Sequence, residues 1–173
     1  DGTVVTYYYK NKNEEHTHTW SDWKYNNDAV YNSSSDYKDG TQTRTCSACG
    51  ESETKEAPNT ALLRRRGNAL SLESSITLAT YITKDVVDYY DEVYAEFTRN
   101  GKTEKVYPSG KTLTSNSIVY CIFDYTGISP QALGDDVSIT FYGVKDGVTY
   151  NGNAYKYSAT DYIKSTLNKP TSS

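Results

Sequence analysis

The segment Leu70-Ser71-Leu72-Glu73-Ser74-Ser75-Ile76-Thr77-Leu78 decides the fold, because its aliphatic residues all occupy even-numbered positions. Successive side chains of a β-strand point to opposite faces, so this spacing predicts strands with one face in a core. The same alternation recurs at 93–98 and 137–142, where apolar residues are separated by Tyr, Glu, Ser and Thr. We therefore expect several half-buried strands in the second part of the chain.

Turn signals and an apolar run complete this β pattern. Asn100-Gly101 predicts a two-residue type I′ hairpin turn, and Lys145-Asp146-Gly147 predicts a second turn. Residues 118–123 are apolar without alternation, so we expect a central strand there. Six or seven short strands over about 110 residues are typical of an immunoglobulin-like sandwich. The predicted core comprises Leu70, Leu72, Ile76, Leu78, Phe97, Cys121, Phe123, Ile139 and Phe141.

We predict an all-β chain in which residues 59–173 form an immunoglobulin-like antiparallel β-sandwich. A short C-terminal helix is expected to begin at Ser158, with Tyr162, Ile163 and Leu167 on one side. Cys121 lies within an apolar run, and the same half of the chain has no histidine. We therefore expect a buried free thiol at this position and not a nucleophile.

Residues 1–58 differ in composition, and we predict that they form a separate small unit. They are polar and rich in Tyr, Asn and Ser, and regular strand signals begin only after 57–60. Short strands are expected at 4–9, 41–46 and 51–56, joined by loops, in a zinc-ribbon-like arrangement. With so few aliphatic residues this unit cannot build a large core, and a bound metal would supply the missing stability.

The metal is suggested by two matched motifs in this first unit. His16-Thr17-His18 places both imidazoles on one face of an extended strand, and Cys46-Ser47-Ala48-Cys49-Gly50 is a knuckle that presents two thiolates. We predict that His16, His18, Cys46 and Cys49 bind one zinc ion, in a structural site because four protein ligands leave no open position. The alternative is a reduced or disulfide-closed turn beside surface histidines.

Aromatic residues suggest a ligand surface. The chain has 18 tyrosines against three phenylalanines. Trp20 shares the histidine face and is expected beside the metal, whereas Trp23 faces the other way. With Tyr25 and Tyr31, Trp23 is predicted to form a flat surface for pyranose rings, with Asn26, Asn27 and Asp28 as polar partners. Tyr155 and Tyr157 share a strand face and offer a second, weaker platform. The alternative is that the tryptophans cover a small core and that tyrosine replaces phenylalanine in a thin β core.

Several functional classes lack support in the sequence. The net charge of −4, without a basic stripe, argues against a nucleic-acid partner. Arg64-Arg65-Arg66 carries too few charges to indicate a polyanion partner. No apolar run approaches the roughly 18 residues that cross a bilayer, so no membrane insertion is expected. The carboxylates, such as Asp85 and Asp135, lie in no catalytic motif, and we predict no catalytic residues and no enzymatic activity.

Four segments of the second unit carry a resemblance to a known module. They are Ala69–Leu78, Tyr125–Asp135, Lys145-Asp146-Gly147 and Tyr157–Leu167. Together they resemble a β-sandwich module of secreted surface proteins from anaerobic Gram-positive gut bacteria, including starch-adherence proteins of amylosome complexes. The first unit resembles the His-x-His-x-Trp…Cys-x-x-Cys-Gly repeats of similar surface proteins. In one starch-adherence arrangement a helical cluster follows the sandwich and the glucan lies between them, whereas this chain stops at Ser173.

The resemblance implies a secreted or cell-surface protein, and the absence of methionine favours a processed chain or a part of a larger multidomain protein. The expected function is non-catalytic carbohydrate binding, with α-glucan such as starch as the polysaccharide partner. The alternative is a structural spacer or adhesion module that binds no sugar. A hydrolase is a distant third hypothesis, because no paired catalytic carboxylates stand out in the sequence.

Overall fold

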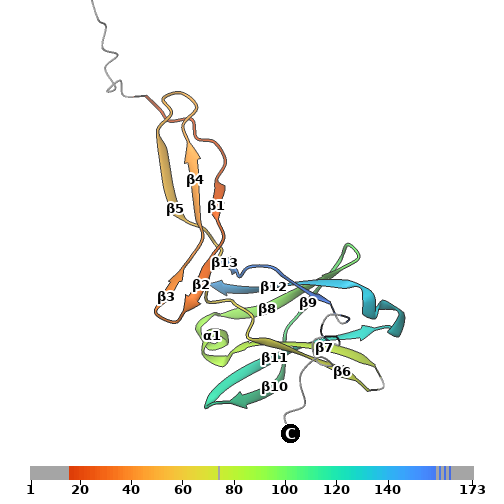
Figure 1. The fold of residues 1–173 in the computed structure, drawn as a ribbon. Helices are drawn as coiled ribbons and strands as arrows, with labels where there is room; N and C mark the ends of the chain where they lie inside the picture. Colours follow the sequence, from red (N-terminus) through yellow and green to blue (C-terminus); the bar gives the residue numbers. More distant parts are fainter. Residues whose placement is uncertain (1–15, 74, 159, 161, 163, 165–173) are drawn as a thin grey trace, which may run out of the picture.

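A computed structural model describes residues 16–73, 75–158, 160, 162 and 164 of the chain. The chain is mostly β, in several antiparallel sheets, which confirms the predicted fold class. Figure 1 shows a narrow arm (residues 16–58) that projects from a wider sandwich (residues 59–158). Among the described residues, no helix is both long and apolar enough to cross a membrane.

The sandwich consists of two antiparallel sheets that face each other across one core. Consecutive strands form hairpins that alternate between the sheets, and this is an immunoglobulin-like topology. The first sheet has the order β10-β11-β7-β6, and its strands are β6 (Gly67–Leu72), β7 (Ile76–Thr83), β10 (Pro108–Ser115) and β11 (Ile118–Ile128). The second has the order β13-β12-β8-β9, with β14 also paired to β12; its strands are β8 (Glu92–Arg99), β9 (Lys102–Val106), β12 (Asp136–Lys145), β13 (Val148–Asn151) and β14 (Tyr155–Ser158).

The core between the sheets follows the predicted alternation. Strand β7 buries every second residue, and β8 and β12 do the same opposite it. The fully buried aromatic and aliphatic side chains of the sandwich are Leu63, Leu78, Ile82, Phe97, Phe123, Ile139 and Phe141. Cys121 is buried as a free thiol, as expected, and burial raises its pKa.

The prediction that Leu72 lies in the core is wrong. Its side chain is 59% exposed, although its partner across the ladder, Ile76, is buried. Leu72 is the last residue of β6, an edge strand paired only with β7. Leu70, two residues earlier, is partly buried and packs against the core. Burial along β6 is therefore incomplete and decreases towards the end of this edge strand.

Three two-residue turns join neighbouring strands of the sandwich and have positive φ at both residues. Asn100 and Gly101 have φ values of 49° and 75°, and Asp146 and Gly147 have values of 50° and 75°, which confirms the two predicted turns. The third turn, at Asn116 and Ser117, was not predicted, and both of its residues have positive φ. Strand β11 lies between β10 and β7 and is central, as expected.

Two short helices connect the sheets, and a third was predicted at the C-terminus. Helix α1 (Lys84–Tyr89) links β7 to β8, and the 3₁₀ helix η1 (Pro130–Gly134) links β11 to β12. Neither was expected from the sequence. Residues 160, 162 and 164 are helical, whereas Asp161, Ile163 and Leu167 of the predicted terminal helix lie outside the described residues.

The arm is a small set of strands with little apolar interior. Its buried apolar residues are all small, namely Ala29, Cys46 and Ala57. The predicted strands at 41–46 and 51–56 are present as β4 and β5, whereas the one at 4–9 lies outside the described residues. The arm comprises a sheet of order β1-β4-β5 and a hairpin, with strands β1 (Lys24–Asn27), β2 (Val30–Ser33), β3 (Asp36–Lys38), β4 (Thr41–Thr45) and β5 (Ser52–Glu56).

Backbone and side-chain hydrogen bonds attach the arm to the sandwich. Asn59 forms a parallel bridge with Asn151, and its side-chain oxygen accepts a hydrogen bond from the Ala29 amide. The Asn153 side chain donates to the carbonyl of Ala29 at 2.7 Å. Gly40 lies against Asn59, and a Cβ at this position would come within 3.1 Å of the Asn59 Cβ. The junction between the arm and the sandwich is therefore closely packed and hydrogen-bonded.

Candidate functional site

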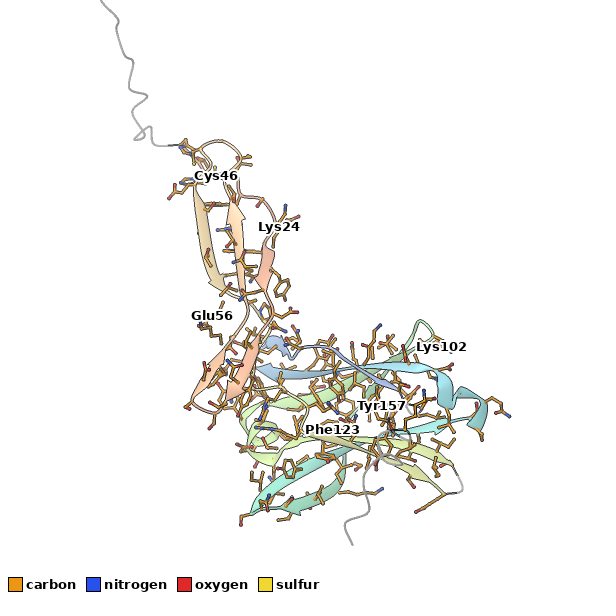
Figure 2. All side chains as sticks on the ribbon, viewed as in Figure 1. Lys24, Cys46, Glu56, Lys102, Phe123 and Tyr157 are labelled. Carbon is orange, nitrogen blue, oxygen red and sulfur yellow. The ribbon has the colours of Figure 1, made fainter. Side chains whose placement is uncertain are left out.

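The four predicted metal ligands lie together at the far tip of the arm. Figure 2 shows Cys46 at the end remote from the sandwich. The ligand atoms of His16, His18, Cys46 and Cys49 all lie within 4.8 Å of one another. Cys46 Sγ is 3.8 Å from His16 Nε2, and Cys49 Sγ is 3.6 Å from His18 Nδ1. Zinc with ordinary bond lengths places sulfur and nitrogen ligands about 3.6 Å apart in a tetrahedron, so these separations fit one ion.

Local backbone structure explains how the two motifs meet. The Cys46 amide donates to the Glu51 carbonyl, and the Gly50 amide donates back to the Cys46 carbonyl at 2.9 Å. Gly50 has a φ of 76°, a conformation that glycine adopts without steric cost, so the chain reverses tightly after Cys49. Trp20 then bridges to Cys46, which aligns the histidine segment beside the knuckle.

The electrostatic environment favours a thiolate at Cys46. Burial raises the pKa of this thiol, but the Cys49 amide, His16, His18 and the Ala48 amide together lower it to about 5. A thiolate is the form of cysteine that binds a metal. Cys46 and Cys49 are free thiols in the structure, so the alternative of a disulfide-closed turn is not present here.

Glu51 is a further member of this site that the sequence analysis missed. Its Oε2 lies 3.5 Å from His18 Nε2, while the other ring nitrogen of His18 faces Cys49. A carboxylate on the distal nitrogen of a metal-binding histidine fixes the ring orientation and the tautomer. Glu51 directly follows the knuckle glycine, and this position was the only sequence signal for its role. An acidic residue is common at such a position in any polar loop, so the signal was not specific.

The two tryptophans lie in the arm next to the His and Cys group that could hold a metal ion. The rings of Trp20 and His18 are stacked with centroids 4.8 Å apart, so Trp20 packs beside the metal ligands as predicted. The Arg44 guanidinium lies over both tryptophan rings, at 4.8 Å and 4.7 Å, and Lys55 lies 4.2 Å from the centroid of Trp23. Both tryptophan rings are therefore partly buried under cationic side chains.

Trp23, Tyr25 and Tyr31 lie at three places in the arm, before β1, in β1 and in β2. Trp23 is packed against cations, whereas Tyr31 lies on the β2–β3 hairpin with the Arg64 guanidinium 3.2 Å from its ring centroid. Tyr25 lies on β1 and is 55% exposed. Of the expected polar partners, Asn26 donates to the hydroxyls of Thr41 and Thr43, and Asn27 accepts from Thr41.

Tyr155 and Tyr157 do not form an exposed platform either. Tyr157 is buried in the sandwich core, and burial raises its pKa to about 12. Tyr155 is partly buried against the same core, and its hydroxyl lies 2.7 Å from that of Thr80. Both side chains share one strand face, as expected, but that face points inward.

A groove between the arm and the sandwich collects other aromatic and polar groups. Its walls are formed by Tyr25 from the arm and Tyr142 from β12, and it encloses about 320 Å³. Asp28 also lines it, and its carboxylate makes no hydrogen bond or ion pair to any described residue. The remaining lining residues are Asn59, Thr140, Asn151, Gly152, Asn153 and Ala154.

Tyr142 begins a row of tyrosines across the outer face of the second sheet. Its ring stacks on that of Tyr94, with centroids 5.1 Å apart, and Tyr94 contacts Tyr107. The Lys105 ammonium lies 3.6 Å from the Tyr94 ring centroid and forms an ion pair with Glu92. Hydrogen bonds from Lys105 and Tyr107 lower the pKa of Glu92. The sequence indicated that Tyr142 faces outward, because it alternates with buried Phe141, but did not indicate that the arm lies beside it.

No protein-family model matches the chain, and a search of curated proteins finds no significant match.

Proposed function

We propose that the chain is a non-catalytic carbohydrate-binding module that binds α-glucan in the groove between arm and sandwich. The observation that carries this proposal is the pairing of Tyr25 and Tyr142 across a groove that also contains Asp28. Tyrosine rings pack against the apolar C–H faces of a pyranose, while carboxylate and amide groups accept and donate hydrogen bonds to its hydroxyls. The groove is open and shallow, and a binding surface needs no deeper cleft.

The arm supplies one wall of this groove, so its folding matters for binding. Its buried apolar residues are too small to stabilise it alone. We propose that the His16, His18, Cys46 and Cys49 group binds zinc, because two thiolates and two imidazoles whose ligand atoms lie within 4.8 Å of one another suit this ion. The ion acts as a structural cross-link, since four protein ligands fill its coordination shell.

The resemblance to starch-adherence modules supports α-glucan as the ligand and secretion to the cell surface as the setting. On this proposal the chain is part of a larger surface protein. The alternative function, a spacer or adhesion module without sugar binding, makes a different prediction for the groove. A spacer requires no exposed tyrosine on either wall of the groove, whereas Tyr25 on the arm wall is 55% exposed.

Affinity electrophoresis in starch, glycogen and an unrelated β-glucan tests the proposal. We expect retardation in the two α-glucans and its loss in Tyr25→Ala and in Tyr142→Ala. Tyr37→Ala serves as a matched control, because Tyr37 is 46% exposed on the β2–β3 hairpin and does not line the groove. No retardation of the wild-type chain in any polysaccharide would overturn the proposal and favour the spacer. Release of reducing sugar would instead indicate a hydrolase.

A further inference from the structure

Three consecutive arginines, Arg64, Arg65 and Arg66, stand at the start of the sandwich without a role in the groove. None of them forms an ion pair with any described carboxylate, although other cations of the chain do so. Their guanidinium groups lie instead over tyrosine rings, Arg64 and Arg66 over Tyr31 and Arg65 over Tyr155, so their positive charge is not neutralised by a described carboxylate.

Two of these arginines line a second cavity of about 210 Å³ on the other side of the junction. Arg64 lies over the Tyr31 ring, and Arg65 lies 4.5 Å from the ring centroid of Tyr155. No Asp or Glu is among the lining residues, so the cavity is cationic with aromatic walls. Asn153 and Ala154 line both this cavity and the tyrosine groove, so the two sites adjoin at one short segment.

The polar atoms of this cavity have capacity for a ligand. The Nε of Arg64 is buried and has no hydrogen-bond partner among the described residues. Buried donors are almost always paired, so this one marks a position where an acceptor is expected. The Arg65 side chain is oriented by Tyr155 and by Asn68. In the amide orientation that satisfies both of its polar atoms, the Asn68 side-chain oxygen accepts a hydrogen bond from Arg65 Nη1 at 2.9 Å.

The nearby carboxylates do not neutralise the two cations. Asp39 accepts hydrogen bonds from the Ala61 amide and the Thr60 hydroxyl through Oδ1. Asp85 lines a neighbouring cavity together with Arg66 and does not line this one. Arg66 therefore has the same charge as Arg64 and Arg65 but lies outside the cavity, which makes it a matched control.

We propose that the cavity lined by Arg64 and Arg65 binds the carboxylate of an acidic sugar, a uronate. The guanidinium fork recognises a planar carboxylate by two parallel hydrogen bonds. The Tyr31 and Tyr155 rings hold the two guanidinium groups in place, and the side-chain oxygen of the exposed Asn153 in the same cavity can accept a hydrogen bond from a sugar hydroxyl. The identification of the ligand as a sugar rests on the proposed carbohydrate-binding function. The shared lining residues Asn153 and Ala154 would allow one branched or substituted glycan to reach both sites.

Isothermal titration with sodium glucuronate, glucose, acetate and sulfate tests this inference on the full chain. We expect saturable binding of glucuronate and at least tenfold weaker binding of the other three. Arg65→Gln should weaken glucuronate binding about tenfold, since a charge-assisted pair is lost, whereas Arg66→Gln should leave it unchanged. Arg65 is exposed, so its replacement is not expected to impair folding.

Two results would overturn the inference. Equal affinity for acetate or sulfate would show that only charge is recognised, and equal weakening by Arg65→Gln and Arg66→Gln would show a diffuse electrostatic effect. A Tyr25→Ala variant that keeps glucuronate binding but loses starch retardation would separate this site from the groove. If the wild-type chain is not retarded in starch but still binds glucuronate, the α-glucan proposal fails and the assignment of the cavity stands.

Discussion

At the scale of single residues, Tyr155 and Tyr157 differ in their hydrogen bonding although they lie two positions apart on β14. The Tyr155 hydroxyl is paired with Thr80, whereas the buried Tyr157 hydroxyl has no partner among the described residues. An unpaired buried hydroxyl opposes folding, because its hydrogen bonds to water are lost without replacement. The sequence shows both residues as tyrosines on one strand face and cannot distinguish these environments.

We expect the two phenylalanine substitutions to have opposite effects on stability. Tyr157→Phe should leave the free energy of unfolding unchanged or raise it by about 1 kcal/mol, because only an unpaired group is removed. Tyr155→Phe should lower it by about 1 kcal/mol, because a hydrogen bond to Thr80 is lost. Urea unfolding at neutral pH measures both changes. A larger loss in Tyr157→Phe than in Tyr155→Phe would contradict the assignment.

Buried tyrosines also predict how stability responds to alkaline pH. Burial raises the pKa of Tyr90 and of Tyr157 to about 12, above the unfolded value of about 10. A group with a raised folded pKa contributes stability that is fully present below pH 10 and is lost as pH rises towards 12. The free energy of unfolding, measured at intervals from pH 8 to 12, should therefore fall above pH 10. Tyr157→Phe should make this fall shallower, and an identical pH profile in both proteins would argue against it.

Glu51 gives a prediction for the metal site. Glu51→Gln should weaken metal binding about tenfold, because the carboxylate beside His18 Nε2 orients the ligating ring. Competition with a chromophoric chelator, with zinc as the metal, measures the affinity. Glu56→Gln, at the other end of β5, removes the same charge far from the knuckle and should change nothing. Equal affinity in Glu51→Gln and in the wild type would contradict a role for Glu51.

At the scale of elements, the turns show what sequence can and cannot indicate. Asn100-Gly101 was recognisable because this dipeptide is the strongest signal for a type I′ turn. Asn116-Ser117 forms a turn with the same positive φ values, but serine rarely occupies that conformation and gives no signal. Leu72 illustrates a second limit, since alternation identifies a face of a strand but not how far along an edge strand that face remains covered.

The Asn116-Ser117 turn leads to a prediction for stability. Ser117 has a φ of 63°, so Ser117→Gly should stabilise the protein by about 1 kcal/mol through relief of backbone strain. Ser115→Gly, two residues earlier in β10, should instead destabilise it by roughly 0.5–1 kcal/mol, because glycine weakens a strand. Thermal unfolding of both variants measures the contrast. Destabilisation by Ser117→Gly would show that the serine side chain contributes to the turn.

At the scale of the whole molecule, the sequence predicted the immunoglobulin-like sandwich and the grouping of four His and Cys residues that could hold a metal ion. Both follow from short-range patterns, namely alternation and matched His and Cys motifs. The junction groove could not be predicted in this way, because Tyr25 and Tyr142 are distant in sequence and meet only through the packing of Asn59 against Gly40. The same holds for the cavity at Arg64, where Asp39 accepts a hydrogen bond from the Ala61 amide and Asp85 lines a neighbouring cavity.

Metal removal should affect the two parts of the molecule differently. Both tryptophans of the chain lie in the arm, so tryptophan fluorescence reports on the arm alone. We expect a chelator to shift their emission to longer wavelength as the arm loosens, while hydrogen exchange at core residues such as Ile139 stays slow. Readdition of zinc should restore the emission. Complete metal removal without a fluorescence change would contradict a structural role for the ion.

The strand order of the sandwich has a consequence for how the chain folds. The hairpins are closed by short turns, so each forms with a small loss of chain entropy. The two sheets, however, are completed by the pairing of β7 with β11 and of β8 with β12. These ladders join segments that are about forty residues apart in sequence, for example Ile82 and Cys121. Such long-range pairing is the slow event in β proteins and takes milliseconds to seconds. The rate-limiting step of folding should therefore be the meeting of preformed hairpins at these two central ladders, and mutations there should change the folding rate more than mutations in the turns.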